Sequence, residues 1–401
     1  MRILVHDYAG HAFPVDLSRE LARRGHTVCH AYASNLVTPR GDLASRPADP
    51  AGLQFKELPM DARYPKWKYS FAKRRGLEVA YGRAAGVWIH QFHPELVISG
   101  NTPTDSQIHL LRATEAVGGR FISWVQDFYG IAVEKLVRKK LGPLGWPVGA
   151  YYRWLDRRIL RASDHTVVIT DDFIPLVMAE GVPFAKITSI PNWAIINELS
   201  VQPKDNPWSR RQDLHDKFVF LYTGTLGMKH NPELLSGLAM HFRDTPEVRV
   251  VVVSEGPGAD WLKQTRLHKN LTNLILLPYQ PFKELPALLG SGDVLVAVLE
   301  PDAGVFSVPS KVLGYLCASR AMLLAMPTEN LAARMVLVAG AGVVVPPGEA
   351  AAFQAAARVL HGDPASRAIH GRSARNFAEA SFGISGIADR FETACGIAPC
   401  P

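Results

Sequence analysis

One segment of the chain places glycines and a lysine where a predicted strand gives way to a predicted helix. Residues 218–235 read FVFLYTGTLGMKHNPELL, in which Gly224 and Thr225 end the strand pattern and Lys229 precedes the helix. Glycines let a ligand approach the backbone closely, and a lysine can neutralise a phosphate as a point charge. The spacing is not that of a Walker A loop. We therefore predict a phosphate-binding turn at Lys229, in preference to a flexible loop with an incidental lysine.

A second anion site is predicted where residues 305–317, VFSVPSKVLGYLC, begin a helix. Ser307, Ser310 and Lys311 crowd its start, where backbone N–H groups lack partners. Together with Lys229 they could hold a diphosphate by a cation, amides and a helix dipole, without a metal. Gly314 follows one turn later, at a position where glycine costs about 1 kcal/mol relative to alanine.

Other polar residues follow predicted strands in both halves of the chain. Asp127 could orient an acceptor hydroxyl or act as a base, and it could equally be a helix N-cap. Gly10 either lets a substrate approach the backbone or only forms a tight turn. No GxGxxG follows the first strand, which disfavours a dinucleotide site. The other candidates of this kind are His11, Gly256, Tyr279, Glu300 and Asp302.

Composition indicates a globular protein of two domains. The 401 residues exceed what one hydrophobic core usually supports, and 47% hydrophobic with 20% charged residues is ordinary. The four cysteines lack zinc-ligand spacing, so we expect no metal. No apolar run reaches membrane-spanning length, and the start shows no signal-peptide pattern. We expect a cytoplasmic location.

Basic and aromatic residues alternate in two stretches of the first half. They are residues 63–75, RYPKWKYSFAKRR, and residues 134–161, and the net charge is +7. Such stretches are either solvated helix faces or a face for an anionic membrane surface. Nucleic acid is disfavoured because no recognition motif is present.

Apolar runs alternate with helix-like segments along the whole chain, which predicts a parallel α/β fold. Strands are expected within residues 1–8, 93–100, 120–127, 165–172, 218–224, 248–256, 271–279, 293–300, 320–326 and 342–348. The predicted organisation is a first domain over 1–190, a linker over 191–216, a second domain over 217–375 and a helical tail over 376–401. Ligands of such sheets bind outside the carboxyl ends of the strands.

The chain resembles the GT4 family of retaining, nucleotide-sugar-dependent glycosyltransferases with the GT-B fold. The resemblance is carried by an ordered set of motifs: ELARRGHTV, HPELVISG, SIPNW, GTLGMKHNPELL, SEGPG, LPYQPFKELPALL and PSKVLGYLCASRAMLL. It implies two Rossmann-like domains facing each other across a cleft, with a tail that crosses back to the first. PSK and IPNW are most similar to members that build bacterial surface polysaccharides on a polyprenyl diphosphate carrier.

The resemblance also implies roles for residues. Lys229 matches a lysine that contacts the donor diphosphate. Gly10 and His11 match a loop near the acceptor and the phosphates. The donor side further comprises the turn at Gly224 and Thr225, Gly256 beside the nucleotide, Tyr279 at the base, Glu300 and Asp302, and the diphosphate loop with Ser307, Val308, Ser310 and Lys311.

Three departures from the family pattern are visible. The two glutamates that commonly contact sugar and ribose are replaced by Phe306 and Gly314, an arginine by Thr225, and a histidine by Gln126. Either Glu300 or Asp302 contacts the donor instead, or donor binding is weak, or Gly314 makes room for a bulkier donor.

The leading hypothesis is a metal-independent hexosyltransferase with retention, peripheral on the inner face of the cell membrane. It would transfer a sugar from a nucleotide-diphosphate sugar, a UDP-sugar, to a polyprenyl-diphosphate-linked or saccharide acceptor, with no cofactor. Lys229 with Asp127 and His11 would be the catalytic residues. The alternatives are a GT-B-fold sugar-nucleotide epimerase and a non-catalytic protein that kept the fold. The donor sugar, the base, the linkage and the oligomeric state stay open.

Overall fold

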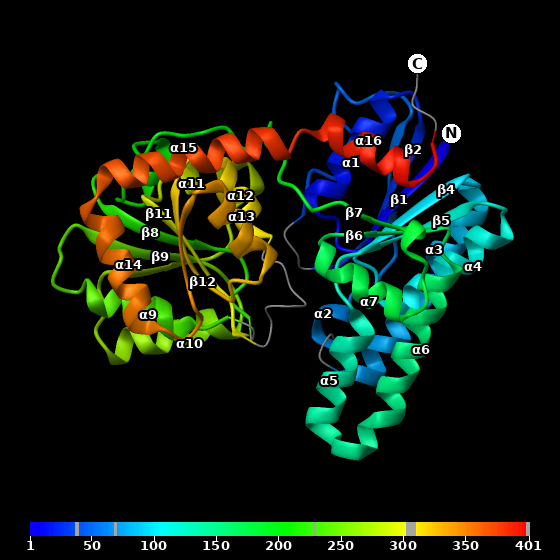
Figure 1. Cartoon of the computed structure of the whole chain (residues 1–401), viewed down its shortest axis with the longest axis horizontal. Coiled ribbons are helices and arrows are strands. Elements are labelled where there is room, and N and C mark those ends of the chain that lie inside the picture. The colour runs from blue at the N-terminus through cyan, green and yellow to red at the C-terminus, as the bar shows by residue number, and fades with distance from the viewer. Residues whose placement is uncertain (37–39, 68–69, 228–229, 302–309, 398–401) are drawn as a thin grey trace. The chain divides into compact units, whose positions relative to one another are not determined.

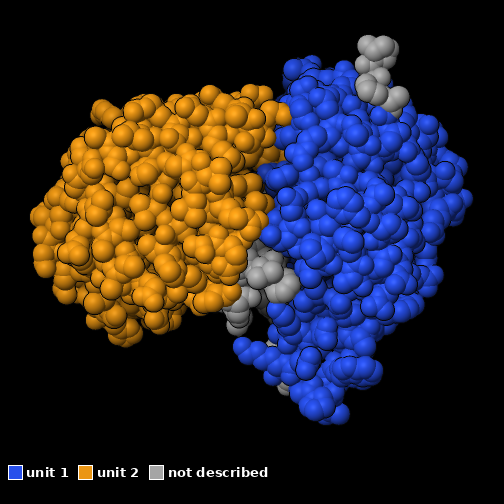
Figure 2. Space-filling view, in the orientation of Figure 1, with its two compact units in different colours: residues 1–192, 384–401 blue, residues 193–383 orange. Residues whose placement is uncertain are grey.

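The chain forms two compact units. A computed structural model describes residues 1–36, 40–67, 70–227, 230–301 and 310–397. Unit 1 comprises Met1–Asn192 with Ile384–Pro401, and unit 2 comprises Trp193–Gly383 (Figure 2). This division differs from the expected one, because residues 193–216 and 376–383 lie with the second unit rather than in a separate linker and tail.

Unit 1 is built on a sheet that has seven parallel strands in the described residues (Figure 1). The strand order is β3-β2-β1-β4-β5-β6-β7. Ile3, Leu4 and Val5 of β1 are almost completely buried, as expected for a strand covered by helices on both faces. The strands are β1 (Arg2–Asp7), β2 (Thr27–Ala33), β3 (Leu53–Leu58), β4 (Leu96–Gly100), β5 (Arg120–Val125), β6 (His165–Val168) and β7 (Ile187–Ser189).

The helices of unit 1 lie mostly between successive strands, as in a doubly wound fold, and the last of them, α16, follows unit 2 in the chain. They are α1 (Ala12–Arg23), α2 (Tyr64–Trp67), α3 (Phe71–Phe92), α4 (Thr104–Ala116), α5 (Tyr129–Leu141), α6 (Trp146–Ala162), α7 (Ile174–Ala179) and α16 (Ile384–Ala394). Short 3₁₀ segments are η1 (Gly142–Gly145), η2 (Asp171–Phe173) and η3 (Phe184–Lys186).

Unit 2 repeats the plan with a smaller parallel sheet of order β10-β9-β8-β11-β12-β13. Its strands are β8 (Phe218–Thr223), β9 (Val248–Val253), β10 (Leu274–Leu277), β11 (Val294–Val298), β12 (Ala321–Ala325) and β13 (Gly342–Val345). Its helices are α8 (Pro207–Arg211), α9 (Pro232–His241), α10 (Pro257–His268), η4 (Phe282–Glu284), α11 (Leu285–Gly290), α12 (Lys311–Cys317), α13 (Leu331–Ala339), α14 (Ala350–Gly362) and α15 (Pro364–Ser381).

The predicted α/β class with two Rossmann-like sheets is confirmed. Each expected strand segment contains a strand, whereas β2, β3 and β7 were not predicted. In unit 1 the strand order reverses between β1 and β4, and in unit 2 between β8 and β11. The register sets Asp7 beside Gly100 and Gly100 beside Trp124, so the carboxyl ends of β1, β4 and β5 are level. These ends are where ligands of doubly wound sheets bind.

The C-terminal segment belongs to unit 1 because α16 is held on α1 by charged groups. Arg24 donates to Glu392 and to Asp389, each at 2.6 Å, and to the backbone oxygen of Ser385 at 2.7 Å. The ring of Phe391 packs edge-on against Trp124, with centroids 4.9 Å apart. Among the described residues, no helix combines the length and the apolar character needed to cross a bilayer.

Candidate functional site

The turn between β1 and α1 brings a buried carboxylate and a histidine together. Asp7 is 1% exposed and accepts hydrogen bonds from the backbone N–H of His11 and from Asn101 Nδ2, the latter at 3.0 Å. His11 Nδ1 lies 3.4 Å from Asp7 Oδ1. Gly10 makes this turn with a φ of +74°, and a side chain there would meet Leu43. The turn therefore presents the His11 ring at the carboxyl edge of the sheet.

The electrostatics of the pair favour a charged histidine. Burial by itself would lower the pKa of His11, but the charge of Asp7 and their hydrogen bond raise it overall. Burial would likewise raise the pKa of Asp7, yet His11 holds it below its ordinary value. His6, also close by, has its pKa lowered to about 4, chiefly by burial, and is neutral at pH 7. Of these two histidines, His11 is thus the one whose charged form the surroundings favour.

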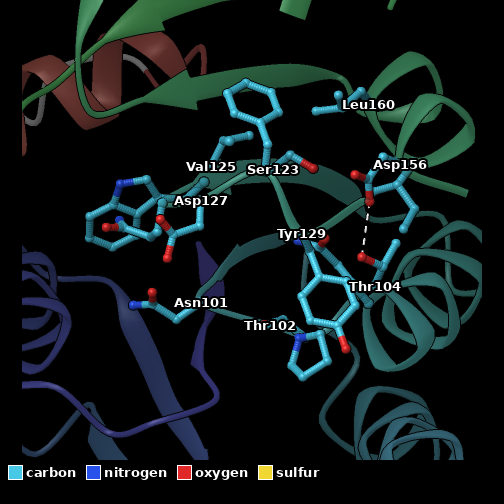
Figure 3. A pocket seen from close by; sticks show the side chains of 15 residues that line it. Asn101, Thr102, Thr104, Ser123, Val125, Asp127, Tyr129, Asp156 and Leu160 are labelled. Atoms are coloured by element: carbon cyan, nitrogen blue, oxygen red, sulfur yellow. Dashed lines mark hydrogen bonds between the residues drawn. The ribbon is translucent and has the colours of Figure 1, made fainter. Parts of the chain in front are cut away.

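Asn101 connects the His11 turn with a cavity at the ends of β4 and β5. Its Nδ2 lies 3.2 Å from His11 Nδ1, and the residue lines the cavity, whose volume is about 240 Å³ (Figure 3). Phe13 stacks on His11 at 5.9 Å between centroids and packs edge-on against Trp124, another lining residue. The turn and the cavity therefore form one continuous region of unit 1.

Asp127 lies on the rim of this cavity and is exposed to solvent. Its neighbour Gln126 forms two amide hydrogen bonds with Asn192, donating at 3.2 Å and accepting at 2.5 Å. Gln126 thus forms a structural pair with Asn192, and Asp127 lines the cavity beside it. The structure brings the predicted residues Gly10, His11 and Asp127 to the same edge of the sheet.

Asp156 of α6 forms the opposite wall of the cavity (Figure 3). Its carboxylate accepts from Thr104 Oγ1 at 2.9 Å and from the backbone N–H of Gly130 at 2.7 Å. Burial raises the pKa of Asp156 to about 6, against these hydrogen bonds. A carboxyl group with such a pKa can hold or release a proton near neutral pH.

Sequence reasoning assigned no role to Asp7, Asn101 or Asp156. The signal for Asp7 was its spacing of four residues from His11 across a glycine turn. Asp156 carried no signal, because it lies among the arginines of RWLDRRILR and reads as part of a solvated basic helix.

In unit 2 the turn after β8 gathers several predicted donor-site residues. Gly224 has a φ of +94°, which suits glycine alone, and the Thr225 hydroxyl lies 2.8 Å from the Tyr279 hydroxyl. Tyr222 holds the turn by donating to the backbone oxygen of Thr225 at 2.9 Å. The backbone of this turn and the hydroxyl groups of Thr225 and Tyr279 thus lie together at the carboxyl end of β8.

Lys311 reaches this turn from the start of α12. Its Nζ lies 3.6 Å from the centroid of the Tyr222 ring, and its Cε would be 3.4 Å from a Cβ at Gly224. Because α12 is only seven residues long, the lysine is a stronger source of positive charge than the helix dipole.

The remaining described donor-site residues lie around the same edge. Gly256, with a φ of +110°, begins α10 and packs near the backbone oxygen of Leu226, two residues beyond Gly224. Glu300 follows β11, and Ser310 precedes α12 without capping it through its side chain. The predicted residues Lys229, Asp302, Ser307 and Val308, and the departure at Phe306, lie outside the described residues.

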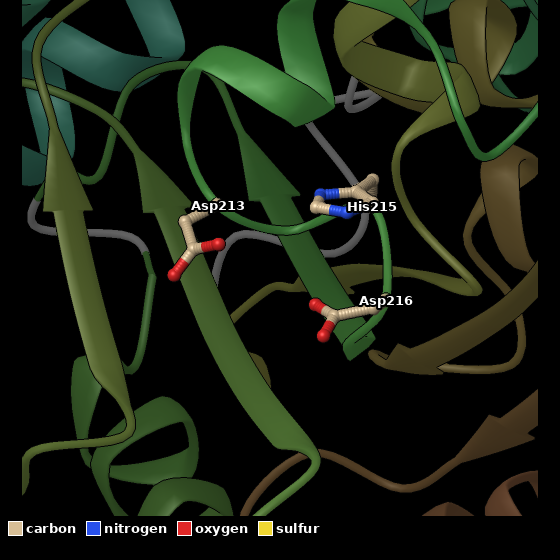
Figure 4. A group of neighbouring side chains, drawn as sticks. All are labelled: Asp213, His215 and Asp216. Carbon is tan, nitrogen blue, oxygen red and sulfur yellow. The ribbon is translucent and has the colours of Figure 1, made fainter.

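Within the described part of the chain, one group of side chains has ligand atoms close enough for a metal. Asp213, His215 and Asp216 place these atoms within 4.8 Å of one another (Figure 4). They precede β8 and so lie at the opposite end of that strand from Gly224. Both carboxylates are exposed and Asp216 pairs with Lys217 at 3.1 Å, as in an ordinary acidic surface loop.

Two Rossmann-like units define the GT-B architecture. In each unit, polar groups lie at the carboxyl ends of the strands beside the switch point, where the strand order reverses. Residues 11–193 match the family model of the glycosyl transferase 4-like domain. Unit 1 is therefore similar to glycosyl transferase 4-like domains, and the predicted resemblance to GT4-like proteins is confirmed.

A curated relative and two solved structures illustrate this similarity. The chain is 29% identical over 202 residues to WcaI of Escherichia coli (strain K12), assigned as a colanic acid biosynthesis glycosyl transferase; the match covers 50% of this chain and 49% of that protein. The chain thus spans about half the length of this relative.

The solved structures match nearly the whole chain at low identity, which shows the fold alone. Sucrose-phosphate synthase from Thermosynechococcus elongatus superposes with a TM-score of 0.72 and 14% identity, covering 99% of this chain and 98% of that one. Anabaena HepE in complex with UDP-glucose gives 0.68 and 14%, covering 99% and 100%.

Proposed function

We propose that the protein is a retaining glycosyltransferase that transfers a sugar from a UDP-sugar to a lipid-linked or saccharide acceptor in surface polysaccharide biosynthesis. The observation that carries the proposal is the continuous site of His11, Asn101 and Asp127 at the switch point of a glycosyl transferase 4-like domain. The name of WcaI supports the link to polysaccharides, and the UDP-glucose complex of HepE supports the donor class.

In this proposal unit 1 binds the acceptor. The Asp7 carboxylate keeps His11 oriented, and His11 or Asp127 contacts the acceptor hydroxyl whose oxygen attacks the sugar. In retaining enzymes that the chain resembles, the attacking hydroxyl and the departing phosphate are thought to lie on one face of the sugar. The cavity lined by Asn101 and Asp156 would then hold groups of the acceptor beyond the reacting hydroxyl.

Unit 2 would bind the donor through the turn at Gly224. A phosphate beside this turn would meet the Lys311 ammonium, and Lys229 is proposed as a second cation of the same site. Catalysis would be mainly electrostatic, because positive charge stabilises the negative charge that grows on the leaving diphosphate. The proposed reaction uses no metal or cofactor.

The first test measures thermal stability against UDP, GDP, ADP and dTDP. A nucleotide at 100 times its dissociation constant stabilises the protein by about 2.7 kcal/mol. We expect UDP to raise the melting temperature of the wild type, and to raise it less in Lys311→Met and Lys229→Ala. The exposed Lys283→Met is the matched control and should respond like the wild type. Equal UDP responses in all four proteins would refute the donor site.

The second test follows transfer from UDP-sugars and reads the anomeric configuration of the product by NMR. Retention of the donor configuration supports the proposal, and inversion refutes it. A non-catalytic protein is the competing hypothesis, supported by Thr225 and Gly314 at positions where the resembling family has charged groups. UDP binding without turnover on any donor would favour that hypothesis.

A further inference from the structure

Helices α5 and α6 form an antiparallel hairpin that extends away from the sheet of unit 1 (Figure 1). Val133, Val137 and Tyr152 make its buried seam. Gly145 and Gly149 let the two helices approach, since a Cβ at these positions would lie 2.5 Å from the backbone oxygen of Val137 and 2.9 Å from Glu134 Cγ. The hairpin is therefore a closely packed projection that can present side chains at a fixed position.

Large apolar side chains also lie on the outside of this hairpin, in addition to those of its seam. At the far end, Leu144 is 82% exposed, Trp146 is 66% exposed and Leu136 is 49% exposed. Trp154, on the outer face of α6, is 50% exposed. Single exposed apolar residues are common, but a group of this size concentrated on one projection marks a surface that is covered by a partner.

Positive charge accompanies these apolar groups. Residues 129–162 contain eight Lys or Arg and two acidic residues. Tyr151, Trp154 and Arg158 recur at helical spacing on one side of α6, where the Arg158 guanidinium lies 5.6 Å from the Trp154 ring centroid. Of the two acids, Asp156 lines the cavity and Glu134 lies 3.9 Å from Arg153. Arg153 and Arg157 also pair with Glu180, so the cations of this surface are Arg158 and the other basic residues of the hairpin.

An anionic lipid surface matches this combination of groups. Tryptophan rings settle at the headgroup level, apolar tips insert below it, and Lys and Arg attract anionic headgroups. A second copy of the same surface would bring like charges together. Nucleic acid would satisfy the cations and leave Leu144 and its neighbours in water.

We propose that the hairpin surface formed by Leu136, Leu144, Trp146, Trp154 and Arg158 docks the protein on an anionic lipid bilayer. The base of the same hairpin lines the candidate acceptor cavity through Asp156, ten residues and about 15 Å along the helix from Trp146. Docking would thus bring the cavity near the headgroups of a lipid-linked acceptor, a consequence that rests on the proposed function.

The test is co-sedimentation of the full chain with vesicles of phosphatidylcholine alone or of phosphatidylcholine and phosphatidylglycerol in equal amounts. We expect binding to the mixed vesicles, weakening with salt, and little binding to the neutral ones. Leu144→Ser with Trp146→Ser should lower the partition coefficient at least ten-fold. Arg158→Gln should lower it about five-fold. Leu267→Ser with Val338→Ser, two residues of unit 2 that are 76% and 81% exposed, is the matched control.

Each outcome bears on the surface independently of the reaction. The melting temperature of every variant and its shift with UDP should equal those of the wild type, so loss of docking is separable from loss of folding or of the donor site. Absence of binding to mixed vesicles, equal binding to neutral vesicles, or equal losses in the control would overturn the proposal. Binding of RNA or self-association abolished by the same variants, without lipid binding, would also overturn it.

Discussion

Replacing Asp156 by Asn should stabilise the protein at neutral pH. The carboxyl group is partly buried in the cavity wall, and burial raises its pKa from the ordinary 3.8 to about 6. A difference of one in pKa corresponds to about 1.4 kcal/mol, so holding this group ionised at pH 7 lowers the free energy of unfolding by about 3 kcal/mol. An asparagine removes the charge and keeps the size of the side chain.

The geometry allows the amide to keep both hydrogen bonds. Its oxygen can accept from the backbone N–H of Gly130, and its nitrogen can donate to Thr104 Oγ1, which now donates to the carboxylate. The exchange of charge-assisted for neutral hydrogen bonds offsets part of the gain. We therefore expect a net stabilisation of about 2 kcal/mol, or roughly 4–8 °C for a unit of this size.

The stability difference between the wild type and Asp156→Asn should depend on pH. The folded state keeps the Asp156 proton to higher pH than the unfolded chain, so the wild type loses stability as the pH rises from about 4 to about 6. The variant should lack this loss, and the difference between the two proteins should be small below pH 4 and constant above pH 6. Denaturant unfolding across this range measures it, with the exposed Asp171→Asn as control. A destabilised variant, or a difference that does not change with pH, would refute the reasoning.

Two further substitutions test other parts of the structure. Gly314→Ala should stabilise unit 2 by about 0.5–1 kcal/mol in denaturant unfolding, because the residue lies within α12 and, among the described residues outside that helix, a Cβ would meet Leu199 alone, at 3.9 Å. A loss of stability would show that this space is filled. Arg24→Ala should destabilise unit 1 by about 2–3 kcal/mol, since it leaves the buried Glu392 without its 2.6 Å partner. The control Arg23→Ala removes an ion pair between Glu20 and a half-exposed arginine, and it should cost under 1 kcal/mol. Equal effects of the two substitutions would refute the anchoring role of Arg24.

Much of the fold followed from the order of apolar runs. Strands such as VRVVVV at β9 and VLVAV at β11 are buried on both faces, so a continuous run of β-branched and aliphatic residues identifies them without tertiary information. The edge strand β3, LQFKEL, was missed because its charged residues break the run, and a strand at the edge of a sheet tolerates them. β2, TVCHAYA, was not predicted either, although four of its residues are fully buried aliphatic or small side chains.

The candidate-site residues that could be predicted from the sequence are those in the turns that follow predicted strands. Gly224 and Thr225 directly follow β8, and Gly10 and His11 lie in the turn after β1. Parallel strands bring their carboxyl ends to one edge, so spacing along the chain was enough to select these residues. Asp127 was selected in the same way.

The sequence by itself determined the two parallel sheets, their strand-end turns and the resemblance to GT4-like proteins, because these depend on local hydrophobicity and on short motifs. Only the tertiary structure decided that Asp7 orients His11, that Asn101 joins this turn to a cavity, and that Asp156 faces inward from a basic helix. Such pairings depend on which face of each helix meets the sheet and on which distant strands become neighbours. Neither can be read from residues that are far apart in the chain.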